Sequence, residues 1–272
     1  MPRRGASIDP DRKGNEAVER FTAVTREVSP AFERCELTHL ARTPLSVDLA
    51  RAQHREYERC LEQLGGSVVR LEPAPNAPDS VFVEDTAVVF DECAVITRPG
   101  AVTRRGEVTA VEELLRRYRP VWRMEAPATL DGGDVLRVGS RVFVGLSSRT
   151  NANGVQQLRE LLAPHGYRVH GVSVHGCLHL KSAVTALSGH LLLINRSWTS
   201  ASAFSDLELL DVDASEPFAA NALPIGDTIL YAAAFPRTRE RIEARGFQMR
   251  AVELSELAKA EGAVTCCSLI LR

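Results

Sequence analysis

Three short motifs of the sequence carry residue types that could act together as a nucleophile, a proton carrier and an acid. Cys266 lies in a TCCS run, His179 in LHLKS and Asp131 in LDGGD. A cysteine thiolate attacks electrophilic carbon, an imidazole donates and accepts protons, and a carboxylate orients the imidazole. We therefore expect a site of the Cys-His-acid type, provided that the fold brings the three motifs together.

A second group of residues could bind a cation. Asp79, Glu84 and Asp85 lie within seven positions of one another. Ionised carboxylates only accept hydrogen bonds, so a cluster of them suits a planar cation with several donors, of which guanidinium is the main biological example. These acids therefore indicate a substrate that is a small cation.

These residues also have plainer interpretations. A free cysteine is among the most buried residue types, and an aspartate beside two glycines is often a turn former. A different functional interpretation starts from His175, Cys177 and His179, which would share one face of a strand and could seat a zinc ion. This spacing matches no common structural zinc signature and lacks a fourth ligand, so we expect no metal site.

A repeated pattern predicts the elements that would position these residues. Pairs of short apolar stretches, joined by two residues suited to tight turns, occur at 81–98, 135–147, 183–196 and 222–234. Such pairs are typical of β-hairpins. Each hairpin therefore delivers the segment in front of it to a defined place in the fold.

A helix and a further strand follow each predicted hairpin. The helices are predicted at 107–118, 151–163, 200–206 and 236–245. The strands that follow them are predicted at 120–124, 167–174, 207–212 and 247–253. A helix at 45–64 and a strand at 67–71 precede the first hairpin in the same order. A unit that recurs every 40–50 residues or so indicates a repeat architecture.

A fifth hairpin can be formed from two distant segments, 266–271 and 21–25. Pairing them would close a ring and remove exposed sheet edges. We therefore predict a five-bladed α/β propeller with pseudo-fivefold repeats, forming a single catalytic domain over 17–272. The alternative is a three-layer α/β fold with antiparallel hairpins. Residues 1–16 are polar and are predicted to form a disordered leader.

The repeat brings the candidate residues to equivalent positions. The first of the five segments that enter the hairpins carries Asp79 with Glu84 and Asp85. The other four carry, in chain order, Asp131, His179, Asn221 and Cys266. Rotation about an axis would place these positions close together. Ionisable groups would not collect in buried segments without a reason, because an unpaired buried carboxylate is costly. The repeat therefore favours the functional interpretation of these residues over the structural one.

Composition limits the classes of partner. The chain is 44% hydrophobic and 25% charged, with a formal net charge of −2 and no concentrated basic stripe, which argues against nucleic acid. No apolar run has the length of a membrane span, and the first residues lack the apolar region of a secretory signal. We expect a cytoplasmic protein with a small-molecule partner, whose six scattered cysteines are free thiols.

Several motifs in the same order closely resemble the dimethylarginine dimethylaminohydrolases, or dimethylargininases, of the guanidine-modifying superfamily of five-bladed propellers. The resemblance covers about residues 45 to 272. Its most specific segments are VFVED, ITRPG, ATLDGGDV, FVGLS with RTN, LHLKS and TCCS, at 81–85, 96–100, 128–135, 143–147 with 149–151, 178–182 and 265–268.

The resemblance implies a role for each site residue. Cys266 would be the nucleophile, His179 the general acid and base, and Asp131 its acidic partner. Asp79, Glu84 and Asp85 would hold the guanidinium group, and Arg104 and Arg149 would hold the α-carboxylate of the substrate. Leu37 would lie in a mobile lid, and a backbone carbonyl near Ala260 would meet the α-amino group. Cys267 and Asn221 receive no role.

The reaction implied is attack of Cys266 on the guanidinium carbon of an Nω-methylated arginine, with release of methylamine or dimethylamine and formation of citrulline through a covalent thiouronium. It needs no cofactor, and the protein could be a homodimer. Many bacterial relatives carry Glu where this chain has Asp131, so the reach of the acid could differ. Two alternatives stay open, namely an arginine deiminase or amidinotransferase of the same superfamily and a non-catalytic protein that binds arginine or methylarginine.

Overall fold

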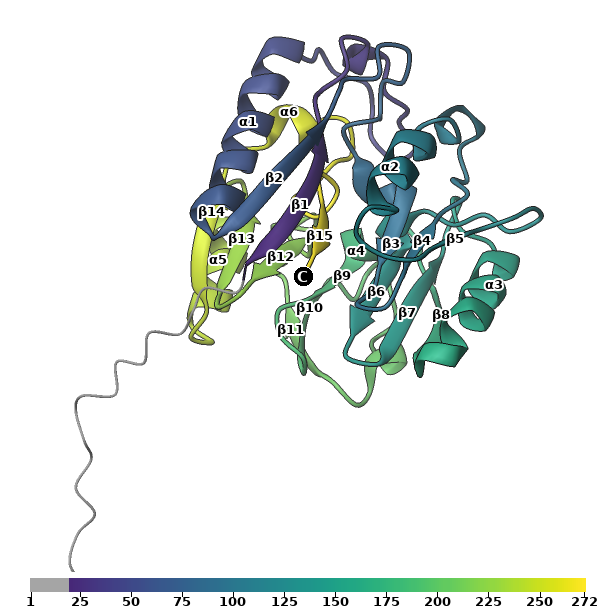
Figure 1. The fold of residues 1–272 in the computed structure, drawn as a ribbon. Helices are drawn as coiled ribbons and strands as arrows, with labels where there is room; N and C mark the ends of the chain where they lie inside the picture. Colours follow the sequence, from purple (N-terminus) through teal and green to yellow (C-terminus); the bar gives the residue numbers. More distant parts are fainter. Residues whose placement is uncertain (1–19) are drawn as a thin grey trace, which may run out of the picture.

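A computed structural model describes residues 20–272 of the chain, in which five small β-sheets are arranged side by side (Figure 1). The predicted leader at 1–16 lies outside the described residues. Each sheet has three strands. In spatial order the strands are β15 (Leu269–Leu271), β1 (Phe21–Arg26) and β2 (Gly66–Leu71); β3 (Ala87–Val89), β4 (Ala94–Ile96) and β5 (Val121–Arg123); β6 (Val135–Val138), β7 (Arg141–Leu146) and β8 (Arg168–Ser173); β9 (Val184–Ala186), β10 (Leu191–Ile194) and β11 (Glu208–Asp211); and β12 (Ala222–Ile225), β13 (Thr228–Ala232) and β14 (Gln248–Val252).

All five sheets have the same pairing pattern. The middle strand pairs antiparallel with its hairpin partner and parallel with the third strand, as β7 does with β6 and β8. Strand β1 follows the same rule, since it is antiparallel to β15 and parallel to β2. The predicted hairpins and the predicted pairing of the terminal strands are thereby confirmed. Five separate sheets over residues 20–272 exclude the three-layer alternative, which requires one central sheet.

A helical segment connects the middle and third strands of every sheet, because parallel neighbours need a crossover connection. These segments are α1 (Val47–Gln63), α2 (Val108–Leu115), α3 (Ala152–Leu162), the short 3-10 helix η6 (Ala201–Phe204) and α5 (Pro236–Glu243). Helix α1 begins where the Ser46 side chain accepts a hydrogen bond from the Leu49 amide. Asn151 caps α3 in the same way, through the Gly154 amide. Two further short helices are α4 (Leu180–Ala183) and α6 (Ser255–Ala258).

Helix α1 also supports the segment that carries the cysteine pair. Tyr57 is fully buried, and its hydroxyl contacts the Val264 carbonyl at 2.9 Å and the Ser268 hydroxyl at 2.7 Å. The buried face of α1 packs in the same apolar cluster as Cys267. The chain just before β15 is therefore fixed on both sides of Cys266.

Three local predictions are wrong. Strand structure predicted from residue 81 begins only at β3, because 83–86 form the 3-10 helix η2 (Val83–Thr86), whose turn is closed by the Thr86 hydroxyl on the Val83 carbonyl. Cys266 lies in a turn before β15 and not in a strand. Residues 176–179 form a bend with Gly176 at φ +74°, so residues 175–179 do not present one strand face.

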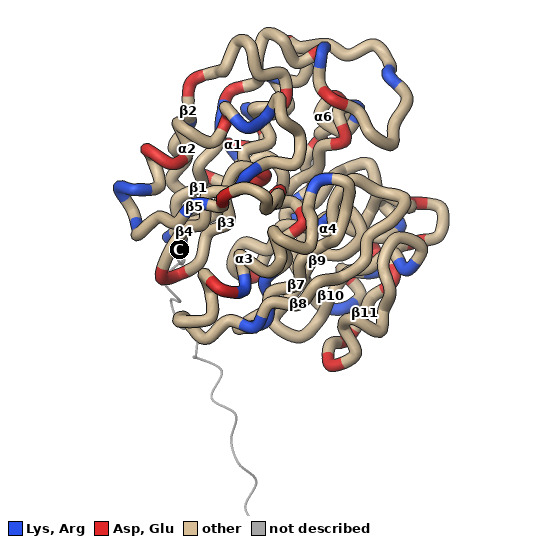
Figure 2. The backbone as a smooth tube through the Cα atoms, turned by 90° about the vertical axis from the view of Figure 1, so that its right-hand side faces the viewer, with Lys and Arg blue, Asp and Glu red and all other residues tan. Residues whose placement is uncertain are grey.

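Basic and acidic residues are interspersed over the backbone in the view of Figure 2, which fits the absence of a basic stripe in the sequence. Over residues 20–272, no helix combines the length and the apolar character that crossing a bilayer would require.

Candidate active site

The segments that precede the first strand of each hairpin meet around one pocket. Asp85 lies in η2, Asp131 precedes the 3-10 helix η4 (Gly132–Asp134), and His179 immediately precedes α4. Cys266 reaches the same pocket from the turn before β15. The residues that line the pocket are Glu36, Asp79, Phe82, Asp85, Arg104, Arg149, Leu178, His179, Ala260, Glu261 and Cys266.

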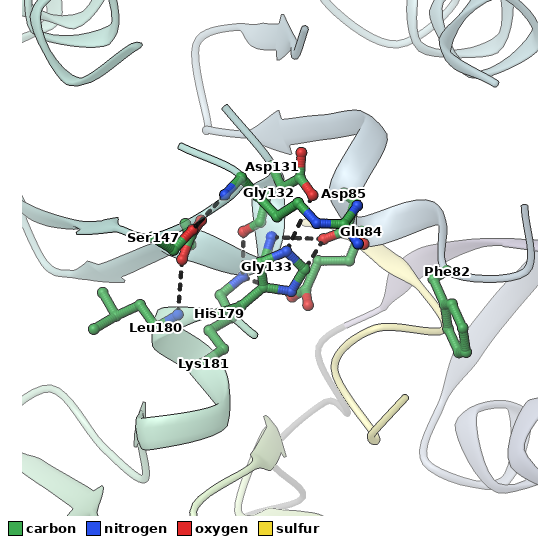
Figure 3. Close-up of polar contacts among 12 residues, drawn as sticks. Phe82, Glu84, Asp85, Asp131, Gly132, Gly133, Ser147, His179, Leu180 and Lys181 are labelled. Atoms are coloured by element: carbon green, nitrogen blue, oxygen red, sulfur yellow. Dashed lines mark hydrogen bonds and ion pairs between the residues drawn. The ribbon is translucent and has the colours of Figure 1, made fainter. Parts of the chain in front are cut away.

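His179 lies between two carboxylates (Figure 3). Its Nε2 is 3.1 Å from Asp131 Oδ2, and its Nδ1 is 3.8 Å from Asp85 Oδ1. Burial alone would lower the pKa of this imidazole, but the charge of Asp85 and the hydrogen bond to Asp131 outweigh burial and raise the pKa to about 9. His179 is therefore an imidazolium at neutral pH, with a proton available on each ring nitrogen.

Asp131 is fully buried and held on two sides. Its Oδ1 accepts a hydrogen bond from the Gly100 amide at 2.9 Å, and its own amide donates to the Thr150 hydroxyl at 3.2 Å. The other oxygen is thereby directed to His179. The shorter side chain of aspartate reaches the imidazole at hydrogen-bonding distance, which answers the question raised by the sequence.

Asp85 stays ionised although it is buried. Burial would raise its pKa, but His179 and Arg104 lower it below the usual value. Arg104 Nη1 donates to Asp85 Oδ2 at 2.5 Å, and the Gly133 amide donates to Asp85 Oδ1 at 3.0 Å. Arg104 also donates to Glu107 and to the Asp79 and Phe82 carbonyls. Its guanidinium group is thus engaged by protein groups on several sides.

The two adjacent cysteines occupy different environments. Cys266 is partly exposed and lines the pocket, whereas Cys267 is fully buried and its Sγ lies 3.6 Å from the Ala263 carbonyl. Burial, together with the charges of Glu84 and Asp85, raises the pKa of the Cys266 thiol above its usual value. Without a ligand, Cys266 is therefore a thiol.

The remaining predicted residues are placed as follows. Asp79, Arg149 and Ala260 line the pocket. Leu37 does not line it but packs, partly buried, against the cluster that includes Phe82. Glu84 also lies outside the lining, because its carboxylate accepts hydrogen bonds from Lys181 at 2.6 Å and from the Thr265 hydroxyl at 2.7 Å.

Asp134 was not predicted as a site residue, although its charge contributes to the raised pKa of His179. This carboxylate is fully buried and accepts hydrogen bonds from the Ser147 and Thr150 hydroxyls and from the Leu180 amide, at 2.6, 2.7 and 2.8 Å. Burial raises its pKa to about 6, although His179 and the hydrogen bonds act in the opposite direction. Asp134 lies in the same LDGGD motif as Asp131, and this was the signal that could have identified it.

Glu36 and Glu261 were also missed. Glu261 lines the pocket, has a φ of +60°, and accepts hydrogen bonds from the amides of Thr38, His39 and Leu40. Arg149 Nη2 donates to the Thr38 hydroxyl at 3.3 Å and is 3.6 Å from Glu36 Oε2. No motif links these distant positions, so only the fold reveals the contacts.

The zinc hypothesis loses its geometric basis. His175 is exposed, and Cys177 is buried with its Sγ 3.4 Å from the His179 carbonyl. Among residues 20–272, the cluster of His, Cys or acidic side chains with ligand atoms close enough for one ion is Asp85, Asp131 and His179. The three members of that cluster are already paired with one another as described above.

The chain is similar to proteins of known sequence and structure. The sequence model of the arginine deiminase family matches residues 10–221. The chain belongs to the arginine deiminase family. It is 40% identical to the N(G),N(G)-dimethylarginine dimethylaminohydrolase of Streptomyces coelicolor over 92% of this chain and 96% of that one. It is 38% identical to the enzyme of the same name from Pseudomonas aeruginosa, over 82% of this chain and 89% of that one.

A solved structure agrees with these relationships. The Pseudomonas aeruginosa dimethylarginine dimethylaminohydrolase, in a cysteine-to-serine variant complexed with citrulline, superposes with a TM-score of 0.88 at 34% identity. The match covers 92% of this chain and 98% of that one. The resemblance to dimethylarginine dimethylaminohydrolases drawn from the sequence motifs is therefore confirmed.

The backbone at Gly133 lies so close to His179 and Asp85 that no side chain fits there. A Cβ at this position would lie 2.6 Å from His179 Nδ1 and 2.8 Å from Asp85 Oδ1. We expect Gly133→Ala to displace the imidazole and to lower kcat by roughly a hundredfold, because misplacing a reacting group by about 1 Å has effects of this size. Steady-state kinetics and a thermal melt measure the effect. Gly189→Ala is the matched control, since a Cβ there meets nothing within 4 Å. Near-normal kcat in Gly133→Ala would contradict this account of the packing.

Proposed function

We propose that the protein is a dimethylargininase, which hydrolyses Nω-methylated arginine to citrulline and methylamine or dimethylamine. The observation that carries the proposal is that Cys266, the His179–Asp131 pair and the acids Asp79 and Asp85 belong to one site, of which all but Asp131 line the same pocket. The relatives are named dimethylarginine dimethylaminohydrolase, and the structure of one of them contains citrulline. Both observations support this reaction.

The pocket suits a cationic amino acid. Asp85 is ionised and accepts hydrogen bonds, so it binds the guanidinium group together with Asp79. Arg149 binds the α-carboxylate, and the Ala260 carbonyl receives the α-amino group. Arg104 and Glu84 act indirectly in this assignment, because Arg104 pairs with Asp85 and Glu107 and Glu84 pairs with Lys181. Leu37 belongs to the segment that covers the substrate.

The first half of the reaction begins with the thiol of Cys266. A substrate cation beside the sulfur lowers the pKa of the thiol, because an opposite charge stabilises the thiolate. The thiolate attacks the guanidinium carbon, so that a carbon–sulfur bond forms. His179 then donates its proton to the departing amine, the carbon–nitrogen bond breaks, and a covalent thiouronium remains on Cys266.

The second half of the reaction regenerates the site. His179, now neutral, takes a proton from water, and the oxygen attacks the thiouronium carbon. The carbon–sulfur bond breaks and citrulline leaves. Since the pKa of His179 is about 9, the protonated imidazolium predominates at neutral pH. It is lost as the pH rises through that value. Turnover should therefore decline on the alkaline side.

The arrangement of the sheets supports the propeller prediction. Five sheets of one topology, with β1 paired to β15, correspond to five blades closed by the two ends of the chain. In this arrangement the pocket lies at the axis, where the five segments meet. A single domain over 17–272, a cytoplasmic location and a homodimer remain predictions from the sequence.

The choice of substrate is tested by a comparison of three arginines. Asymmetric dimethylarginine and monomethylarginine should both give citrulline faster than unmethylated arginine does, with kcat/KM as the measure. Faster turnover of arginine would instead favour a deiminase. Tight binding in calorimetry without citrulline would favour a binding protein, and transfer of an amidino group to an added amine would favour an amidinotransferase.

The two adjacent cysteines can be distinguished by substitution. Cys266→Ser should abolish turnover and still bind substrate, because it removes the nucleophile and leaves the acidic pocket in place. Cys267→Ser should keep most of the activity, because Cys267 faces the apolar cluster around α1 and not the pocket. Citrulline assays with calorimetry separate binding from chemistry. Greater damage from Cys267→Ser would contradict the assignment of Cys266.

His179 can be tested separately from the thiol. His179→Gln should remove nearly all hydrolysis, but Cys266 should still react with chloroacetamidine, whose chloride leaves without a proton. Mass spectrometry measures the adduct. Metal content and a thermal melt are measured on the same samples, because a structural zinc ion would contribute to folding. One equivalent of zinc in the wild type and a strongly lowered melting temperature in the variant would overturn the mechanism.

A further inference from the structure

A closed ring of hydrogen bonds lies next to the pocket. Lys181 Nζ donates to Glu84 Oε1 at 2.6 Å, and the Thr265 hydroxyl donates to Glu84 Oε2 at 2.7 Å. Asn221 Nδ2 donates to the Thr265 hydroxyl and to the Lys181 carbonyl, both at 3.0 Å. Starting from Lys181, the bonds therefore pass through Glu84, Thr265 and Asn221 and return to Lys181.

The ring joins all five segments that precede the hairpins. Glu84, Lys181, Asn221 and Thr265 precede β3, β9, β12 and β15, and Lys181 Nζ reaches the segment before β6 through the Gly132 carbonyl at 3.2 Å. Two members lie next to reacting groups in the sequence. Thr265 directly precedes Cys266, and Lys181 follows His179 by two residues. The ring therefore connects the backbone segment that carries Cys266 to the backbone segment that carries His179.

Asn221 has a specific place in this ring. It is buried, and besides its two donated hydrogen bonds its Oδ1 accepts one from the Thr265 amide at 3.0 Å. Thr265 is thus held through its backbone and through its side chain by one amide group. We propose that Asn221 is a positioning residue, which aligns Cys266 with the guanidinium carbon by fixing Thr265 against the segment of His179. The effect on turnover rests on the proposed function, whereas the effect on thiol alignment does not.

The chemistry of the position favours an amide. Aspartate would lose the donors to Thr265 and to the Lys181 carbonyl and would add a negative charge close to Glu84. Alanine would leave the Thr265 amide and the Lys181 carbonyl without their partner, and an unsatisfied buried group is costly. A planar amide offers a donor and an acceptor side by side, as the two contacts to Thr265 require.

The experiment compares two electrophiles that differ in their need for alignment. Chloroacetamidine is an amidinium cation that must bind beside the acids before Cys266 attacks it, whereas iodoacetamide is neutral and reacts with any accessible thiolate. We expect Asn221→Ala to slow the alkylation of Cys266 by chloroacetamidine by roughly tenfold to a hundredfold. Its reaction with iodoacetamide should change by less than about threefold. Peptide mass spectrometry distinguishes Cys266 from Cys267.

Asn195→Ala is the matched control. Asn195 is equally buried and makes two side-chain hydrogen bonds to backbone, with the Pro217 carbonyl and the Ser197 amide, but it lies outside the ring and the pocket. It should lower the melting temperature without changing the ratio of the two alkylation rates. If Asn221→Ala merely reproduces the control, or slows both reagents equally, the proposal is overturned.

Turnover provides a second reading on the same variants. Asn221→Ala should lower kcat for methylarginine by about the same factor as the chloroacetamidine rate, with little change in KM, because the acids and Arg149 are untouched. If the wild type forms no citrulline at all, the proposed function fails and the alkylation ratio still decides the role of Asn221.

A pair of Thr265 variants covers the case in which Asn221→Ala does not fold. Thr265→Val removes the hydroxyl that joins Asn221 to Glu84, while Thr265→Ser retains it. We expect the alkylation ratio to shift in Thr265→Val and to return toward the wild-type value in Thr265→Ser. Equal ratios in the two variants would contradict a positioning role for the ring.

Discussion

The pairing of buried charges around His179 is the constraint on which the rest of the site depends. An imidazolium, three carboxylates and a guanidinium are buried together, and each would be costly alone. They form a continuous series in which Asp131 contacts His179, Asp85 lies near its other nitrogen, and Arg104 joins Asp85 to Glu107. Removing one member leaves its neighbour unpaired. The five sheets must therefore place these segments so that every buried charge keeps its partner.

The same environment separates the protonation states of the two reacting groups. Neighbouring carboxylates keep the proton on His179, and they also oppose ionisation of Cys266. Without a ligand, the site therefore contains an imidazolium and a neutral thiol. A cation in the pocket changes the second without removing the first, since it offsets the negative charge beside the sulfur. In the proposed reaction, substrate binding and activation of the nucleophile are therefore a single electrostatic event.

The repeat in the sequence predicted much of this site, because hairpins with two-residue turns can be recognised locally. It located β6, β7, β9, β10, β12 and β13 and therefore the segments in front of them. What it could not predict was the backbone of those segments. Cys266, expected in a strand, lies in a turn, and η2 replaces the start of the first hairpin. These conformations arise from contacts across the chain, such as the Glu84 amide on the Cys266 carbonyl.

The sequence also could not predict which distant residues pair with the charged ones. Glu84 was predicted to hold the guanidinium group together with Asp79 and Asp85, and its carboxylate pairs in the structure with Lys181, 97 positions away. Glu261, which lines the pocket, accepts hydrogen bonds from three amides of the segment 38–40, and the cost of its positive φ is offset by these hydrogen bonds. Acids of identical chemistry thus line the pocket, pair with a lysine or hold backbone amides, and which of these they do follows from the donors that the fold places beside them.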